Sequence, residues 1–359
     1  MGKVKLESIC TIVSGSTPKS SCPEYWGGSI KWVTPAEISD ETHYIEDTER
    51  HITEEGMRSC HLRMMPSGTV LLSSRAPIGK TAITKSAMCC NQGFKNLICG
   101  NSISNEYLYH FLKSKTDELK SIGRGATFKE ISKKQVESIT INLPALDEQN
   151  RRTAALGQID MLLKQNRKLT GIIDDLVKSR FVEMFGDPIE NDSKLPKCKW
   201  EDVLTIVNGK NQKKAECATG EYPICGSGGE MGRARQYLTK GDSVIIGRKG
   251  NINNPILMRE PFWNVDTAFG LEPNADILRV EYLYYYCEWF DFQKLNKAVT
   301  IPSLTKADLL KIEMPLPPLA LQQEFAGFVT HVDKLRFATQ QQIEKLETLK
   351  KSLMQEYFG

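Results

Sequence analysis

Residues 143–186 read LPALDEQNRRTAALGQIDMLLKQNRKLTGIIDDLVKSRFVEMFG, and residues 316–359 read LPPLALQQEFAGFVTHVDKLRFATQQQIEKLETLKKSLMQEYFG. A constant offset of 173 aligns the two stretches without a gap, and 12 of the 44 positions are identical. Each stretch opens at a Leu-Pro pair and closes at Phe-Gly, as expected of a long helix bounded by helix-stopping residues. The chain therefore contains two copies of one domain-sized unit, which can form a pseudo-dimer.

The repeat extends upstream of both helices. Gly68 and Arg75 align with Gly241 and Arg248, in each case around a short apolar run. Between such anchors the two halves differ at most positions. A shared scaffold with different loops indicates one kind of task performed on two targets, whereas an old duplication would have drifted evenly.

Length and composition indicate two domains of ordinary globular character. The chain has 359 residues, 40% hydrophobic and 25% charged, with a net charge of +3. No apolar run approaches the roughly 18 residues of a membrane span, and the first residues lack the apolar core of a signal peptide, so we expect a cytoplasmic protein without a membrane partner. The ten cysteines show no Cys-x-x-Cys spacing and are interpreted as small buried hydrophobes.

The predicted fold class is α+β. We expect two mixed α/β domains separated by two long antiparallel coiled-coil helices, with a pseudo-twofold repeat. Short apolar runs bounded by Gly, Pro and Ser predict strands, and the segments 14–30 and 226–232 are expected to be loops. The expected boundaries are a first domain at 1–143, a helix at 144–186, a linker at 187–198, a second domain at 199–315 and a second helix at 316–359.

Both helices carry apolar residues at alternating spacings of four and three, which predicts a coiled-coil seam. Polar residues in its middle would fix register and partner. The alternative is that each helix packs on its own domain. The predicted seam consists of Ala155, Ile159, Leu162, Asn166, Leu169, Ile173 and Leu176 in the first helix, and Phe328, Val332, Leu335, Thr339, Gln342, Leu346 and Leu349 in the second.

The length of the helices suggests that they hold the two domains at a fixed distance from each other. A helix of about 37 residues is roughly 55 Å long at about 1.5 Å per residue, whereas B-DNA repeats about every 34–36 Å. Two domains held that far apart could each read a short half-site, with unread base pairs between them.

Positive charge is concentrated in one stretch. Residues 208–254 contain eight basic and four acidic side chains among Gly, Ser and Asn. Loops of this kind suit a phosphate backbone, although a merely solvated surface would have the same composition.

Sequence signatures of catalysis are missing. The chain has no Asp/Asn-Pro-Pro-Tyr/Phe tetrapeptide of amino-methyltransferases, no dinucleotide or P-loop glycine motif, and no metal-ligand spacing among its five histidines. We therefore expect a protein without catalytic residues, metal or cofactor.

The chain resembles the specificity subunit of type I restriction–modification systems over essentially its whole length. The resemblance rests on Leu-Pro followed by Gln149 and a helix closing in Phe-Gly-Asp-Pro, and on Leu-Pro-Pro followed by Gln322-Gln323-Glu324. It is supported by Gly15-Ser16-Thr17-Pro18 and Tyr25-Trp26-Gly27-Gly28 in the first half, and by Gly226-Ser227-Gly228-Gly229 and Gly247-Arg248-Lys249-Gly250 in the second.

The resemblance implies a non-catalytic subunit whose two domains each read one half of a split target in double-stranded DNA. It implies helices that set the spacer and dock two modification (methyltransferase) subunits. S-adenosylmethionine would then lie on those partners, and ATP and Mg on restriction subunits where these are present.

DNA contacts are expected from cationic loops and from amides. Arg75 and Arg248 follow equivalent apolar runs and are the first candidates. Most cations would contact phosphate, whereas Arg, Asn and Gln can also read base edges. The further candidates are Lys80, Arg124 and Lys129 in the first domain, and Gln212, Lys213, Lys214, Arg233, Arg235, Lys249, Asn251, Asn253 and Asn254 in the second.

Three rival interpretations remain open. A free-standing DNA-modifying enzyme would transfer methyl groups alone. A coiled-coil adaptor that binds only protein would show no salt-sensitive DNA binding. A subunit serving a fused restriction–modification enzyme would be distinguished by the neighbouring genes.

Overall fold

The computed structural model describes residues 2–123, 130–298 and 300–359. Its chain forms two compact units. Unit 1 comprises Met1–Gln165 with Ile343–Gly359, and unit 2 comprises Asn166–Gln342. Each unit therefore combines one globular part with one half of each long helix.

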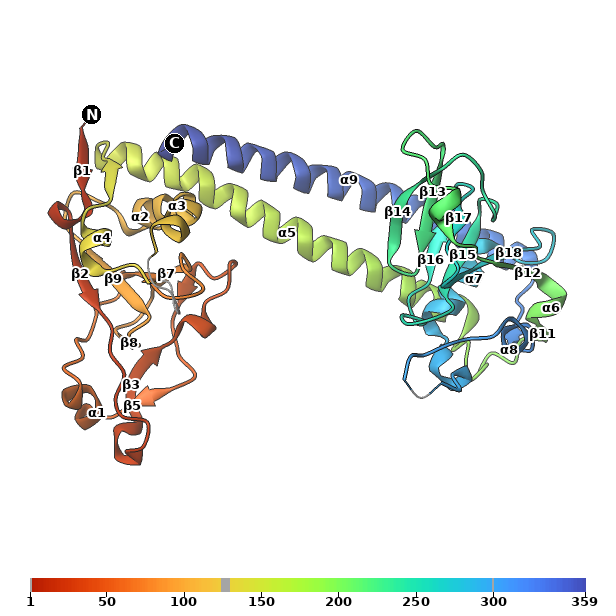
Figure 1. Cartoon of the computed structure of the whole chain (residues 1–359), viewed down its shortest axis with the longest axis horizontal. Helices are drawn as coiled ribbons and strands as arrows, with labels where there is room; N and C mark the ends of the chain where they lie inside the picture. Colours follow the sequence, from red (N-terminus) through yellow and green to blue (C-terminus); the bar gives the residue numbers. More distant parts are fainter. Residues whose placement is uncertain (1, 124–129, 299) are drawn as a thin grey trace. The chain divides into compact units, whose positions relative to one another are not determined.

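Unit 1 is built on a five-stranded sheet in the order β2-β9-β6-β7-β4, beside a three-stranded sheet in the order β5-β3-β8 and a β1-β10 pair. Figure 1 shows these strands with the short helices α2 and α3 near the start of α5. The elements are β1 (Lys3–Lys5), β2 (Cys10–Ser14), β3 (Trp26–Val33), β4 (Tyr44–Ile45), β5 (His51–Ile52), α1 (Glu54–Ser59), β6 (Val70–Ser73), β7 (Thr81–Thr84), β8 (Cys89–Cys90), β9 (Phe94–Cys99), α2 (Asn105–Ser114), α3 (Thr116–Ile122), α4 (Lys133–Glu137) and β10 (Thr140–Asn142).

Unit 2 repeats this plan in shorter form. Its sheets have the orders β12-β18-β15-β16, β14-β13-β17 and β11-β19. The elements are β11 (Lys197–Lys199), α6 (Trp200–Val203), β12 (Leu204–Asn208), η4 (Gln212–Lys214), β13 (Tyr222–Gly226), β14 (Gly229–Ala234), β15 (Ser243–Gly247), β16 (Ile256–Met258), β17 (Trp263–Asn264), β18 (Ala268–Pro273), α7 (Val280–Trp289), η5 (Phe292–Leu295), α8 (Lys306–Leu310) and β19 (Glu313–Pro315).

The two units share an antiparallel three-stranded frame, β2-β9-β6 in unit 1 and β12-β18-β15 in unit 2. The inner strands β6 and β15 are buried along their whole length, which explains their continuous apolar sequences. The predicted α+β class with an internal repeat is confirmed.

Two segments expected to be loops contain strands. β3 begins at Trp26 inside the 14–30 segment, and β14 begins at Gly229 inside the 226–232 segment. Gly229 pairs with Gly226 across the turn Ser227-Gly228 of the β13–β14 hairpin, and its φ of +102° lies in the region that favours glycine. The glycine-rich run is thus the tip of a hairpin.

The long helices are α5 (Leu146–Phe185) and α9 (Leu319–Phe358). In each unit they run side by side in opposite directions, as Figure 1 shows. Ion pairs join Asp160 to Lys350 in unit 1 and Asp174 to Arg336 in unit 2. Helix α5 stops at Phe185 because Gly186 adopts a φ of +76°, the left-handed conformation typical of a helix C-terminus.

A buried glutamine fastens each long helix to its own globular part. The Gln149 side chain accepts a hydrogen bond from the Ser104 amide (2.9 Å) and donates to the carbonyls of Ser102 (2.9 Å) and Pro144 (2.9 Å). Gln322 makes the corresponding bonds with Arg279 (2.8 Å), Ile277 (3.1 Å) and Pro317 (2.8 Å). The helices therefore pack on their own domains as well as on each other, so the two arrangements offered as alternatives coexist.

The seam between the helices differs from the predicted one at alternate positions. Ile159, Asn166 and Ile173 are buried as expected in α5, and Val332, Thr339 and the half-buried Leu346 in α9. The intervening buried or half-buried positions are Leu163, Thr170 and Val177 in α5, and Arg336, Ile343 and Lys350 in α9.

Each intervening position thus lies one residue beyond the predicted one. The exposed residues that were predicted in their place are Leu162, Leu169 and Leu176 in α5, and Leu335, Gln342 and Leu349 in α9. The end positions Ala155 and Phe328 are half-buried. The prediction took the residue three positions after each buried one, whereas the helices bury the residue four positions after it. Both positions lie on the same face of a helix, so the spacing alone does not decide between them. At two of these places the buried side is filled by the aliphatic stems of Arg336 and Lys350, whose charged ends pair with α5.

Candidate nucleic-acid interface

The end of strand β6 in unit 1 presents an arginine on a fixed backbone. The Ser74 amide donates to the Gly93 carbonyl (2.7 Å), and the Ser74 carbonyl accepts from the Ile131 amide (2.8 Å). Ser73 and Ser74 are fully buried. Arg75 is therefore the first residue beyond β6 that reaches solvent, at a backbone position held from both sides.

Glu130 connects Arg75 to a second cation. Arg75 Nε lies 2.9 Å from one carboxylate oxygen, and Lys95 Nζ lies 3.2 Å from the other. Lys95 is almost completely buried in β9 and also reaches Ser74 Oγ at 3.4 Å. Although partial burial opposes ionisation, hydrogen bonds from Arg75 and Lys95 hold the pKa of Glu130 below its ordinary value. The Glu130 carboxylate is therefore ionised at neutral pH, and it holds the Arg75 guanidinium in place.

Unit 2 repeats the backbone frame with different side chains. The Arg248 amide donates to the Thr267 carbonyl (2.7 Å), and the Arg248 carbonyl accepts from the Leu304 amide (2.9 Å). The backbone of Lys249 forms an isolated antiparallel β-bridge with that of Ser303, as the backbone of Arg75 does with that of Glu130.

The strand register therefore makes Lys249 the counterpart of Arg75. Val70 pairs with Leu97 in unit 1, and Val244 pairs with Leu271 in unit 2. Counted from these pairs, Arg248 is the structural equivalent of Ser74. The equivalence of Arg75 with Arg248 expected from sequence is wrong by one residue, because the sequence alignment was anchored on glycines outside the paired strands.

The second cation of each cluster comes from a different strand. In unit 1 it is Lys95 on β9. In unit 2 the position of Lys95 is taken by Phe269, and the Arg248 guanidinium lies 5.7 Å from the centre of that ring, within cation–π range. Both sheet ends thus carry two cations, but Glu130 neutralises part of the charge in unit 1, whereas its counterpart in unit 2 is Ser303.

Of the other candidates in unit 1, the structure describes only Lys80. The Lys80 ammonium donates to the Pro35 carbonyl (3.1 Å), so it fastens a loop. Arg124 and Lys129 lie outside the described residues. Sequence reasoning missed Arg50, whose guanidinium stacks on the Trp26 ring at 3.7 Å. It also missed Lys95 and Glu130, since a lysine inside an apolar strand and a lone glutamate carry no motif.

In unit 2, Lys213 and Lys214 are exposed on η4, which Asn211 caps by accepting from the Lys213 amide (3.0 Å). Half-buried Gln212 begins this turn. Arg233 is paired with Glu230 (3.0 Å), as Arg75 is with Glu130.

Arg235 is exposed on the chain that follows β14. Hydrogen bonds from Thr219 and Arg235 lower the pKa of the Cys217 thiol to about 7. Arg235 therefore has a partner in the isolated chain but keeps its guanidinium accessible to solvent.

The asparagines of the 251–254 loop have separate roles. Asn253 donates to Asp291 (2.8 Å) and accepts from the Phe292 amide (2.8 Å). Asn254 donates to the Ser227 carbonyl (2.8 Å) at the hairpin tip. These two side chains hold loops in place, whereas Asn251 is exposed and remains the amide best placed to contact a ligand.

Within the described part of the chain, no group of three or more His, Cys, Asp and Glu side chains could hold a metal ion. Among the same residues, no helix is long and apolar enough to cross a membrane.

The fold and these sheet ends define a class of protein with two related globular parts on a pair of antiparallel helices. Each part presents cations at the end of a sheet, on loops that differ between the two units. A profile of the family described as type I restriction modification DNA specificity domain matches residues 1–171 and 194–348. The chain belongs to this family, and it is a non-catalytic DNA specificity subunit of a type I restriction–modification system.

Individual proteins of this family are similar to the chain in sequence and in fold. The chain is 28% identical over 392 aligned positions to the type I restriction enzyme MjaIX specificity subunit of Methanocaldococcus jannaschii, covering 98% of this chain and 90% of that subunit. The fold is similar to the crystal structure of a type I restriction–modification S subunit from M. genitalium, with a TM-score of 0.66 at 16% identity, covering 100% and 96% of the two chains. A chain from a structural study of type I complex assembly gives a TM-score of 0.59 at 18% identity, covering 99% of this chain and 97% of that one.

Proposed function

We propose that the chain reads a bipartite DNA sequence, with each globular part recognising one half. The observation that carries this proposal is the repeated backbone frame at the ends of β6 and β15. One pattern of hydrogen bonds presents Arg75 in unit 1 and Lys249 in unit 2, while the chemistry around them differs. A constant frame with variable side chains suits two readers of different half-sites.

The cations have different roles in the proposed recognition of DNA. Exposed Lys213, Lys214 and Lys249 neutralise phosphates and position the protein. Arg75 can pair bidentately with guanine, because Glu130 and the backbone hold its guanidinium. Asn251 can read adenine in the second half-site.

The helices set the number of base pairs between the half-sites and dock two modification subunits. Identical leucines recur on both helices, Leu162 with Leu335 and Leu176 with Leu349, and all four are at least one-third exposed. Each unit holds one leucine of each pair. Exposed leucines at equivalent places in both units suit two copies of one partner.

The cofactors follow from this division of labour. S-adenosylmethionine binds to the modification subunits, and ATP and Mg to restriction subunits where these are present. A fused restriction–modification enzyme would be served through the same helix surface.

Salt-dependent DNA binding tests the proposal against a protein-only adaptor. The chain purified with its cognate modification subunits should bind duplex DNA, and the affinity should fall steeply as salt rises, because each phosphate contact releases a counterion. The slope should decrease by about one when Lys249 is replaced by Ala. Binding that is absent, or that is insensitive to salt, would contradict DNA reading and support the adaptor.

A further inference from the structure

The sheets of the two units end differently. In unit 1, β4 pairs in parallel with β7 and covers that edge of the sheet, and the amides of Ile83 and Lys85 donate to the segment 43–45 at 2.8 Å each. In unit 2 the sheet ends at β16, which pairs with β15 as β7 pairs with β6. Within the described residues, no strand pairs with the second edge of β16. The register makes Leu257 and Arg259 the counterparts of Ile83 and Lys85, so their amides face the open edge.

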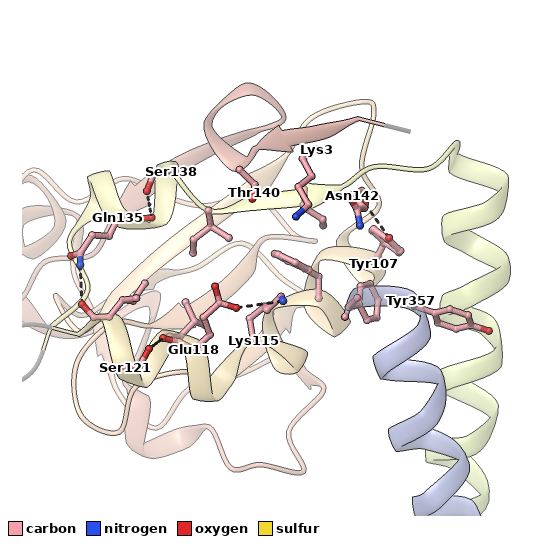
Figure 2. A pocket seen from close by; sticks show the side chains of 17 residues that line it. Lys3, Tyr107, Lys115, Glu118, Ser121, Gln135, Ser138, Thr140, Asn142 and Tyr357 are labelled. Carbon is pink, nitrogen blue, oxygen red and sulfur yellow. Dashed lines mark hydrogen bonds and ion pairs between the residues drawn. The ribbon is translucent and has the colours of Figure 1, made fainter.

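The helix that packs on each of these strands is also equivalent, α2 on β7 and α7 on β16. Tyr107 on α2, which lines the pocket of about 600 Å³ drawn in Figure 2, donates to the carbonyl of Asn142 (3.1 Å). Tyr282 on α7 donates in the same way to the carbonyl of Pro315 (2.7 Å). The run Glu-Tyr-Leu-Tyr that contains each tyrosine therefore lies at the same place on the two helices.

In unit 1 the segment 43–45 covers this face of the helix. His43 Nε2 lies 2.8 Å from one carboxylate oxygen of Glu106, and the Tyr44 hydroxyl donates to the other (2.5 Å). The His43 ring is stacked between the rings of Tyr44 and Tyr109, with its centre 4.3 Å from that of each. The segment therefore provides partners for the glutamate and for the strand edge at the same time.

In unit 2 the equivalent place is an open pocket of about 510 Å³. Leu257 of β16 and Tyr284 and Glu288 of α7 line it, and side chains of α5 and α9 complete the wall, all within unit 2. Leu257 and Tyr284 are half-buried, whereas their counterparts Ile83 and Tyr109 are 1% and 4% exposed. The surface that the chain covers in unit 1 is therefore accessible in unit 2.

Glu281, the counterpart of Glu106, lacks a second partner. It lies one turn before Tyr284 on the same face of α7 and is almost completely buried. One carboxylate oxygen pairs with Arg259 (2.7 Å), but Oε2 is buried and has no hydrogen-bond partner among the described residues. A buried acceptor without a partner destabilises the protein, so a ligand that donates a hydrogen bond to it is favoured.

The charges of the pocket indicate what kind of segment fits. The charged residues of its lining are three carboxylates and two cations, namely Asp174, Glu288, Asp333, Lys178 and Arg336. Asp174 and Asp333 both pair with Arg336, whereas Glu288 is exposed. This wall suits hydrogen-bond donors and not an acidic ligand.

We propose that the open edge of β16 and the pocket beside α7 bind an extended segment of a partner protein, which adds a parallel strand to the sheet and places an aromatic hydrogen-bond donor, tyrosine or histidine, on Tyr284 and Glu281. The segment 43–45 has this arrangement in unit 1. A second copy of the chain could supply that segment only by opening its own unit 1, so the occupant is a different protein. The site goes beyond DNA reading and does not depend on it.

A fluorescein-labelled peptide tests the proposal by fluorescence anisotropy against the full chain. Its sequence, Lys-Ser-Thr-His-Tyr-Ile-Ser-Lys, keeps residues 42–45 and replaces their acidic flanks. Wild-type protein should bind it with a Kd below about 1 mM. Glu288→Trp, which fills the pocket from an exposed position on α7, should weaken binding about tenfold or more. Glu313→Trp, exposed on β19 outside the pocket, is the matched control and should bind as wild type does.

Two further readouts do not rely on a bulky substitution. A peptide with Phe-Phe in place of His-Tyr keeps the rings but has no donor for Glu281, so it should bind about tenfold more weakly or worse. Hydrogen exchange at the Leu257 and Arg259 amides should slow when the original peptide binds, because an added strand accepts from them. Unchanged exchange with bound peptide would contradict the added strand.

Three other results would overturn the proposal. The first is no binding at millimolar peptide. The second is equal binding of the peptide by the wild-type and Glu288→Trp proteins, or equal binding of the two peptides by the wild type. The third is concentration-dependent dimerisation of the chain that Glu288→Trp abolishes, because the occupant would then be a second copy.

Discussion

The cations at the two sheet ends are neutralised differently. Arg75 shares Glu130 with Lys95, whereas Lys249 faces Ser303. A guanidinium held by a carboxylate loses little freedom when it binds, so it is suited to base reading. An exposed lysine beside a serine keeps its charge for phosphate. The first half-site should therefore depend on the geometry of its cation more than the second.

Arg248→Ala should lower affinity for the half-site read by residues 199–315 by about 1–3 kcal/mol, or roughly 5- to 150-fold. The loss comes from the charge, which the Phe269 ring, 5.7 Å from the guanidinium, helps to hold in position. Competition binding with duplexes altered in one half-site at a time measures it. Arg75→Ala should act reciprocally on the other half-site, and an equal loss on both half-sites from either variant would contradict the assignment.

His110 gives unit 1 a pH-dependent stability. Burial in α2 lowers the pKa of His110 to about 4, with a further lowering from His43. In the unfolded chain His110 takes up a proton near pH 6.5, whereas in the folded chain it does so near pH 4. The contribution of His110 to the free energy of unfolding is therefore fully present above about pH 6.5 and is lost as pH falls toward 4.

The His110 contribution should amount to about 2 kcal/mol between pH 7 and pH 5. Urea unfolding at the two pH values measures it, and His110→Phe should remove most of the difference. A wild-type difference that the variant retains in full would place the pH dependence elsewhere.

At the scale of elements, Gln149 and Gln322 attach the long helices to their globular parts. Gln149→Ala removes a buried side chain with three hydrogen bonds and should destabilise unit 1 by about 2–3 kcal/mol. Gln158→Ala, at an exposed position of the same helix, should change the free energy of unfolding by less than about 0.5 kcal/mol. Thermal or urea unfolding distinguishes them, and equal effects would mean that the glutamine does not act as an anchor.

Two neighbouring residues of α5 allow the packing of the helix to be tested separately from the docking of the modification subunit. Val177 is fully buried, whereas Leu176 is 49% exposed. Val177→Ala should cost about 2 kcal/mol of stability. Leu176→Asp should leave stability nearly unchanged and should weaken association with the modification subunit, as measured by size-exclusion chromatography or calorimetry. Loss of stability without loss of association would refute the docking surface.

The sequence predicted the existence, direction and approximate ends of the two helices, since α5 begins two residues after Pro144 and ends at Phe185. It could not predict the phase of the seam at alternate positions. There, leucines that face solvent precede residues whose burial depends on a partner, such as Val177 in α5 or Arg336 opposite Asp174. Periodicity identifies an apolar face but not which edge of it is covered.

The candidate interface was predictable in part. Cations after apolar strands indicated Arg75 and Arg248, but their true correspondence required the pairing of β6 with β9 and of β15 with β18. Contacts between distant segments, such as that of Glu130 with Lys95, leave no local pattern. The roles of Asn253 and Asn254 in holding loops were hidden for the same reason.

At the scale of the whole molecule, two units repeat one three-stranded frame, one glutamine anchor and one helix, and they differ in the loops that carry the cations. Under the proposed function, the parts that the units share serve assembly, and the loops that differ serve recognition. Exchange of the variable part should therefore change the DNA sequence that is read without changing the complex that is formed.

Mapping of methylated sites in a host strain that expresses this chain with its cognate modification subunit tests that claim most directly. The expected result is a split motif, methylated on both strands. Only one half of the motif should change when residues 199–315 are replaced by those of another specificity subunit. A continuous motif, or a change in both halves after the replacement, would contradict the assignment of one half-site to each unit.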